Sequence, residues 1–76
     1  MKAYVLIKTE LGGAAEVVKE LGDIGGVKEA HSITGPYDVI AVIEAPNPGE
    51  IATLVMSRLQ KLGKVKDTMT CFALGS

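Results

Sequence analysis

The order of apolar and polar residues along the chain predicts four strands. Residues 3–8 and 37–43 are short runs rich in β-branched, aromatic and other apolar residues, with apolar side chains on both faces, as in the central strands of a sheet. Residues 27–33 mix charged and small side chains, which is typical of an edge strand. Residues 65–74 alternate two sets of side chains with a period of two and predict the last strand.

The first predicted helix lies between the first two strands. It follows Gly12-Gly13 and ends at Gly22, a residue type that commonly terminates helices. Apolar residues recur at the spacing of one helical face, and charged residues fall on the other face. The apolar positions are Ala14, Val17, Val18 and Leu21.

The second predicted helix has the clearest start in the sequence. Asn47 is suited to the N-cap, Pro48 to the first helical position and Glu50 to the third, where its side chain reaches back to the cap. We therefore predict a helix that begins at this motif and ends at Gly63. Its apolar stripe is Ile51, Leu54, Val55, Leu59 and Leu62.

The element order βαββαβ is that of the ferredoxin-like α+β fold, an antiparallel four-stranded sheet with two helices on one face, which residues 1–76 would form as one domain. The first and third strands of that fold are central, in agreement with their apolar composition. The opposite face of the sheet then exposes Val5 or Leu6 and residues 39–43 to water. Because so small a domain buries only about 60% of its unfolded surface, we expect an obligate homodimer in which a second sheet covers this face, a dimeric α+β barrel.

Composition excludes several classes of protein. Cys71 and His31 are the only residues of their types, so the chain offers neither a disulfide nor a Cys/His metal centre, and we expect no cofactor. Eight Lys and Arg are scattered along a chain of net charge -1, which argues against direct binding of nucleic acid. No apolar run approaches the roughly 18 residues that span a bilayer, and no signal peptide opens the chain. We therefore predict a cytoplasmic protein.

Three segments, in the right order and at the right spacing, carry a resemblance to a known family. They are Gly26-Val27, Thr34-Gly35-Pro36-Tyr37-Asp38-Val39 and Leu62-Gly63-Lys64-Val65-Lys66-Asp67-Thr68-Met69-Thr70. The chain resembles the effector-binding domain for regulation of amino-acid metabolism, the RAM domain, of the Lrp/AsnC feast/famine regulators. Because its first strand begins so near residue 1, the resemblance implies a stand-alone member without the helix-turn-helix domain of these regulators.

The resemblance also implies a function and partners. In that family the sheets of two subunits face each other, dimers assemble into rings such as octamers, and free amino acids bind in clefts between dimers. The chain is thus expected to be an amino-acid-sensing, oligomerising regulatory domain rather than an enzyme, with full-length Lrp/AsnC regulators as further candidate partners.

The turn before the third strand offers the groups that a free amino acid needs. Gly35 allows close approach of the backbone, the amides of Tyr37 and Asp38 are suited to a carboxylate, and Pro36 donates nothing. The Asp38 carboxylate is suited to the ammonium and Tyr37 to a wall of the site. Hydroxyls of a neighbouring subunit and an adaptable thioether complete the candidate site. These come from Thr68, Thr70 and Met69.

Each of these residues also has a purely structural interpretation. Gly35-Pro36 suits any hairpin, and Asp38 can accept backbone amides at its turn. Threonines are common in strands, Cys71 fits a small core residue and His31 an edge-strand side chain. Three other functions also stay open. One is a ligand-independent adaptor of full-length regulators, and another is an ACT-like amino-acid-binding module whose effector turn is Gly12-Gly13. The third is a small dimeric barrel enzyme, although the chain lacks the paired carboxylates that would favour it.

Overall fold

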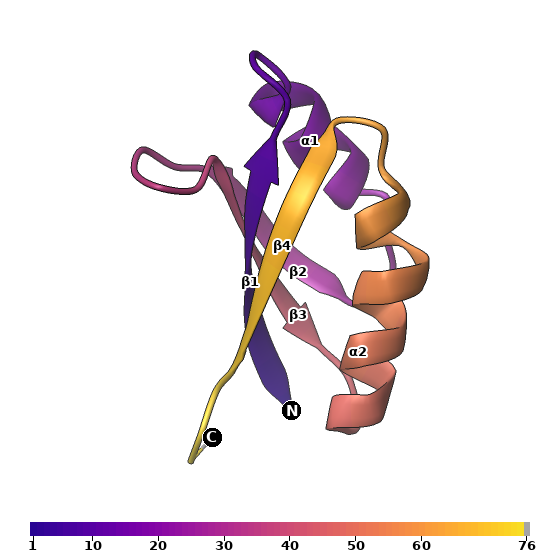
Figure 1. Cartoon of the computed structure of the whole chain (residues 1–76). Helices are drawn as coiled ribbons and strands as arrows, with labels where there is room; N and C mark the ends of the chain where they lie inside the picture. The colour runs from indigo at the N-terminus through magenta and orange to yellow at the C-terminus, as the bar shows by residue number, and fades with distance from the viewer. Residues whose placement is uncertain (76) are drawn as a thin grey trace.

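The computed structural model describes residues 1–75, which fold around one antiparallel sheet of their own strands (Figure 1). The strands lie in the order β2-β3-β1-β4, and each neighbouring pair is antiparallel. The ferredoxin-like βαββαβ order is therefore confirmed, with β1 and β3 at the centre and β2 at an edge. In chain order the elements are β1 (Lys2–Thr9), α1 (Ala14–Leu21), β2 (Val27–Ser32), β3 (Val39–Glu44), α2 (Pro48–Ser57), the 3₁₀ helix η1 (Leu59–Lys61) and β4 (Val65–Phe72).

The hydrophobic core lies on one face of the sheet, because both helices pack on that face (Figure 1). Val17 and Leu21 of α1 and Ile51 and Val55 of α2 are buried against it, which confirms the apolar faces predicted for the helices. Every second residue of β1 and β3 points the same way. The buried strand residues on this face are Ala3, Val5, Ile7, Val39, Ala41 and Ile43.

The second helix ends earlier than predicted. Its α-helical part stops at Ser57, a 3₁₀ turn follows at Leu59–Lys61, and Leu62 already has extended backbone. The prediction of one helix up to Gly63 was therefore wrong. The tighter turn has a packing reason, because it leaves Leu59 fully buried in the core while the chain turns into β4. Within residues 1–75, no helix is both long and apolar enough to cross a membrane.

The start of α2 gives a testable prediction for stability. Asn47 Oδ1 accepts a hydrogen bond from the Glu50 amide at 2.9 Å, and its Nδ2 donates to Glu50 Oε2 at 3.2 Å. Replacing Asn47 by Ala leaves the Glu50 amide without its cap, so we expect a loss of about 1 kcal/mol in the free energy of unfolding, measured with urea. Asn47→Asp keeps the acceptor and serves as the control. Equal stability of the Ala variant and the natural protein would contradict the capping role.

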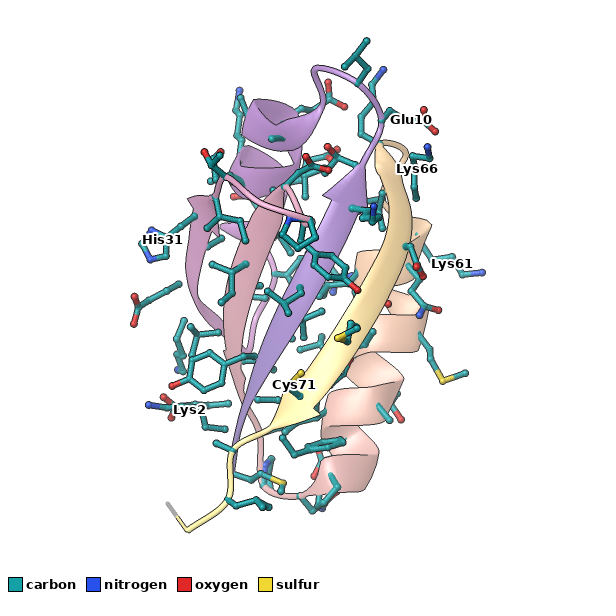
Figure 2. All side chains as sticks on the ribbon, turned by 60° about the vertical axis from the view of Figure 1, so that its left-hand side comes forward. Lys2, Glu10, His31, Lys61, Lys66 and Cys71 are labelled. Carbon is teal, nitrogen blue, oxygen red and sulfur yellow. The ribbon has the colours of Figure 1, made fainter. Side chains whose placement is uncertain are left out.

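No element within residues 1–75 covers the other face of the sheet (Figure 2). Figure 2 views the molecule from this side, with the helices behind the sheet. The strand register brings Leu6 of β1 between Ile40 of β3 and Met69 of β4, with Tyr4 beside them. Leu6 and Ile40 are half-buried, whereas Tyr4 and Met69 are 39% and 46% exposed. We call this surface the open face, and it consists of Tyr4, Leu6, Ile40, Val42, Met69 and Cys71.

A bare side of the sheet was expected, and the open face agrees with that expectation. The residues that lie on it differ from the expectation in two details. Of the residues expected there, Val5 and three of the five in 39–43 point to the helices instead, because side chains alternate along a strand. Cys71 is exposed on the open face and is not a core residue. Charged residues lie at the rim, where Lys2 pairs with Glu44 and Lys8 with Asp67 in the strand register.

Several strand boundaries also differ from the predictions, and those of the first strand and the end of the third differ by one residue. The second strand ends at Ser32 and the last at Phe72, one and two residues early. The third strand begins at Val39 instead of residue 37, so Tyr37 and Asp38 belong to the preceding loop. The backbone of Asp38 is nevertheless bonded on both sides, because its amide donates to the Ile7 carbonyl and its carbonyl accepts from the Ile33 amide, each at 2.9 Å.

Candidate functional site

Asp38 is held at the end of β1 by a hydrogen bond that joins distant parts of the chain. Its Oδ2 accepts from the Thr9 amide at 2.9 Å, and this partner lies 29 residues away in sequence. The amide of Asp38 already donates to Ile7, so the structure contradicts the expectation that this amide is free to bind a carboxylate. The side chain is half-buried, and only one of its carboxylate oxygens is used by a protein donor within the described residues.

An open cavity of about 370 Å³ adjoins Asp38. It lies where β1 ends and the chain turns into α1, and it carries charges of both signs, from Asp38, Glu10 and Lys66. Figure 2 shows Glu10 and Lys66 at this end of the sheet, on the same side of the molecule. Its other lining residues are Thr9, Leu11, Gly12, Ala14 and Ala15. We call this space the end cavity.

The N-terminus of α1 forms one wall of the end cavity. The first helical hydrogen bond runs from the Val17 amide to the Gly13 carbonyl, and no side chain caps the helix. The amides of Ala14 and Ala15 therefore have no helical acceptor and are suited to an anion. Gly13 is needed here for close approach, because a Cβ atom would lie 3.0 Å from the Lys64 Cβ atom.

Lys66 reaches the end cavity because of a bulge between β1 and β4. Lys8 pairs with Asp67 and Thr9 with Val65, so Lys66 is the extra residue at the register shift. Bulges of this kind redirect a side chain relative to the regular strand. Sequence patterns did not identify Lys66 or Glu10 as site residues, because nothing in the alternation of residues 65–74 marks the bulge.

Tyr37 and Met69 meet on the open face, away from the end cavity. The Tyr37 hydroxyl lies 3.8 Å from the Met69 sulfur, and the Lys8 ammonium lies 5.8 Å from the centre of the Tyr37 ring. The preceding loop is exposed, and Gly35 has φ +152, a conformation that side-chain-bearing residues rarely adopt. The loop before β3 projects on the side of the sheet away from the helices, beside the open face (Figure 1).

Thr68 and Thr70 lie on the opposite side of β4 from Met69. They line a groove of about 250 Å³ between β4 and α2, together with Phe72, Met56 and other residues. Thr68 Oγ1 accepts a hydrogen bond from Gln60 Nε2 at 3.0 Å. The seven candidate residues thus occupy three places in one chain: the end cavity, the border of the open face and this groove. We call the last the β4 groove, lined by Ala52, Val55, Met56, Gln60, Thr68, Thr70 and Phe72.

His31 lies outside all three places. It projects from the edge strand β2, where its Nε2 lies 3.1 Å from Glu29 Oε1, and both side chains are about 60% exposed (Figure 2). Among residues 1–75, no three His, Cys, Asp or Glu side chains come close enough to hold a metal ion.

The element order and sheet define the class of the protein as a ferredoxin-like α+β domain. Within this class, the model of the "Lrp/AsnC ligand binding domain" family matches residues 2–76, and the chain belongs to that family. The family relates it to transcriptional regulators, and its ligand-binding module is the part that this chain represents.

Several known proteins are similar to this chain in sequence or in structure. An uncharacterized HTH-type transcriptional regulator of Pyrococcus furiosus is 30% identical over 71 residues, which are 90% of this chain and 47% of that protein. The chain therefore spans about half the length of the curated regulators it matches. A homocitrate synthase of Sulfurisphaera tokodaii is 29% identical over 75 residues, 97% of this chain and 16% of the synthase. The crystal structure of TTHA0845 from Thermus thermophilus superposes with a TM-score of 0.92 at 27% identity and covers 99% of this chain and 94% of that one.

Proposed function

We propose that the chain is an amino-acid-sensing domain that binds a free amino acid and assembles through homodimers into larger rings, and so modulates regulation of transcription. The observation that carries this proposal is the end cavity in a member of a ligand-binding family. Its charges of both signs match a ligand that presents a carboxylate and an ammonium a short distance apart.

Each charged group of a free amino acid has a complement in the end cavity. The α1 amides of Ala14 and Ala15 and the Lys66 ammonium are suited to the carboxylate. The oxygen of Asp38 that does not bind Thr9 is suited to the ammonium, with Glu10 nearby. The volume of about 370 Å³ falls in the range of small-molecule sites. Because the cavity is open, we propose that a neighbouring dimer closes it and that the ligand lies at that interface.

The open face supports the homodimer. Its centre is apolar and its rim is charged, which is the usual anatomy of a protein interface. A second copy brings an equal face, so that Leu6, Ile40 and Met69 of each subunit lose contact with water. Tyr37, which contacts Met69 at the border of this face, then lies near both the dimer contact and the loop that carries Asp38. This gives the ligand a route to change the assembly.

The relation to a homocitrate synthase favours a second candidate function. That protein is an enzyme, and the part similar to this chain is a small fraction of it. A domain of this type attached to a biosynthetic enzyme is suited to the role of an ACT-like effector module. The position of the end cavity at the turn after β1 agrees with this alternative, since the ACT-like effector turn was expected at Gly12-Gly13. A ligand-independent adaptor of full-length regulators is the remaining alternative.

Thermal unfolding in the presence of each of the twenty amino acids tests the proposal. A ligand present at about 100 times its dissociation constant stabilises the folded state by about 2.7 kcal/mol. For a domain of this size each kcal/mol raises the midpoint by about 4–8 °C, so we expect a rise of roughly 10–20 °C for a few chemically related amino acids. Isothermal titration then gives the affinity and the stoichiometry per subunit.

Controls separate binding at the end cavity from general effects of solutes. The N-acetyl and amide derivatives of the effective amino acid lack one charge each and are expected to give no shift, because the site needs both groups. Failure of all twenty amino acids at millimolar concentration would reject amino-acid sensing and favour the adaptor, whose test is capture of a helix-turn-helix regulator by the purified chain.

A further inference from the structure

Glu10 is a charged residue of the end cavity whose backbone is held in place by three hydrogen bonds. Its amide donates to the Lys64 carbonyl at 2.7 Å, and its carbonyl accepts from the Gly13 amide at 2.8 Å. The Thr9 hydroxyl donates to the same carbonyl at 3.1 Å. The turn after β1 is therefore fixed at Glu10, although the side chain itself is exposed. A carboxylate placed in this way contacts a ligand with little further loss of backbone freedom.

The carboxylate of Glu10 has no cationic partner in the part of the chain that the structure describes. No Lys or Arg side chain forms an ion pair with it within residues 1–75, although Lys66 lines the same cavity (Figure 2). The lining of the end cavity holds two carboxylates, those of Asp38 and Glu10, and one ammonium, that of Lys66. Its charged side chains thus carry one negative charge in excess.

A free amino acid with a neutral side chain leaves this excess charge uncompensated. In the proposed site, Lys66 and the α1 amides bind the ligand carboxylate and Asp38 binds its ammonium, so Glu10 stays without a partner. An acidic side chain brings a third carboxylate into the cavity and is repelled by Glu10. A side chain that ends in a cation instead balances the charge of the cavity and gives Glu10 a charged hydrogen-bond donor.

The residue next to Glu10 is suited to the aliphatic part of such a side chain. Leu11 lines the end cavity and is fully exposed, and Ala14 and Ala15 add small apolar contacts on the wall formed by α1. Lysine and arginine side chains cover apolar surface with their methylene groups while the charged end stays with polar groups. The turn after β1 therefore offers an acceptor for the cation directly beside an apolar surface for the stem.

We infer that the end cavity selects an amino acid with a basic side chain, and that Glu10 is the residue that determines this preference. The inference rests on the proposed function, because it names the class of amino acid for the same site. Each charged side chain of the cavity then has one task. Lys66 binds the ligand carboxylate, Asp38 binds the α-ammonium and Glu10 binds the cation at the end of the side chain.

Titration calorimetry with matched ligands tests this preference in the natural protein. Norleucine has the carbon chain of lysine without the terminal ammonium, and Nε-acetyl-lysine keeps the α-amino acid but has no side-chain charge. We expect at least one of lysine, ornithine and arginine to bind about fivefold or more tightly than either control, the upper range for a partly exposed ion pair. At roughly 1 M salt, where the screening length is about 3 Å, this preference is expected to decrease.

Two matched variants assign the preference to one side chain. Glu10→Gln removes the charge and keeps the size of the side chain, so the ratio of the two affinities, basic ligand over norleucine, is expected to fall to about one. Glu16→Gln is the control. Glu16 is also an exposed acid, in the first turn of α1, but it does not line the end cavity, so this variant is expected to keep the natural ratio. If Glu10→Gln does not fold, the comparison of lysine with Nε-acetyl-lysine decides the question in the natural protein.

The possible results separate this inference from the proposed function. The inference is overturned if norleucine or Nε-acetyl-lysine binds as tightly as the basic amino acids, if Glu10→Gln keeps the preference, or if Glu16→Gln loses it equally. Binding of neutral amino acids that depends on Asp38 leaves the proposed function intact in each of these cases. Absence of binding for all twenty amino acids would instead reject the proposed function, and this inference with it.

Discussion

Substitution of Leu6 by Asp is expected to convert the protein to a monomer at micromolar concentration. Leu6 lies at the centre of the open face between Ile40 and Met69. Burial of about 500 Å² of apolar surface per subunit contributes on the order of 10 kcal/mol before the costs of association, as much as the whole stability of a small domain. A carboxylate at the centre loses this burial and places two unpaired charges inside the interface, at a cost of several kcal/mol.

The expected effect of Leu6→Asp is a dimer weakened at least a hundredfold, measured by analytical ultracentrifugation over a range of concentrations. Far-ultraviolet circular dichroism establishes whether the monomer keeps its fold, which is expected because Leu6 is already half-exposed within one chain. Leu11→Asp is the matched control, since Leu11 is fully exposed in the turn after β1. Its mass should not fall below that of the dimer. A stable dimer of Leu6→Asp would exclude the open face as the dimer contact.

Substitution of Asp38 by Asn is expected to weaken amino-acid binding about 10- to 100-fold while preserving the fold. The Asn side chain keeps an oxygen that accepts from the Thr9 amide, now held by Asp38 Oδ2 at 2.9 Å. It removes the charge that the ligand ammonium requires. Loss of one charged hydrogen bond in a shielded site costs about 1.5–3 kcal/mol, which corresponds to about a 10- to 100-fold loss of affinity.

Comparison of Asp38→Ala with Asp38→Asn separates the two roles of the side chain, the charge for the ligand and the acceptor for the Thr9 amide. Asp38→Ala removes both the charge and the acceptor, so it should abolish binding and also lower the free energy of unfolding by about 1–3 kcal/mol, because the Thr9 amide loses its partner. Both variants are expected to remain dimers, since Asp38 does not belong to the open face. Titration calorimetry and urea unfolding measure the two effects. Unchanged affinity in Asp38→Asn would remove this carboxylate from the ligand site and leave it as a structural cap only.

The capping residues of α2 and the periodic spacing of apolar residues could be predicted from the sequence, because they depend on residues that are close together along the chain. The cap at Asn47 forms with Glu50, three residues away, as expected from the residue types alone. The end of the same helix could not be predicted from the sequence in this way. Its change to a 3₁₀ turn depends on how Leu59 fits against the sheet, and that fit involves residues far away along the chain.

The candidate site was only partly predictable for the same reason. Asp38 was singled out as the lone acid at its turn, and the structure places it at the end cavity. Its contact with Thr9 and the proximity of Lys66 were not foreseen. Lys66 comes close because β1 and β4 pair out of regular register near Thr9. The Thr9 contact instead lies where the β1–β3 pairing ends. Strand pairings over such long separations leave no mark in the local pattern.

The sequence by itself determined the element order, the two central strands, the uncovered second face of the sheet and the acid at the turn. These follow from side-chain periodicity and turn chemistry, which act over a few residues. Only the tertiary structure decided which side chains lie on each face of the sheet. It placed Thr68 and Thr70 on the opposite side of β4 from Met69. It also decided that the amide of Asp38 is already bonded and that α1, Glu10 and Lys66 surround one cavity. Such features depend on strand pairing over long separations, because a shift of one residue in register moves every side chain to the other face.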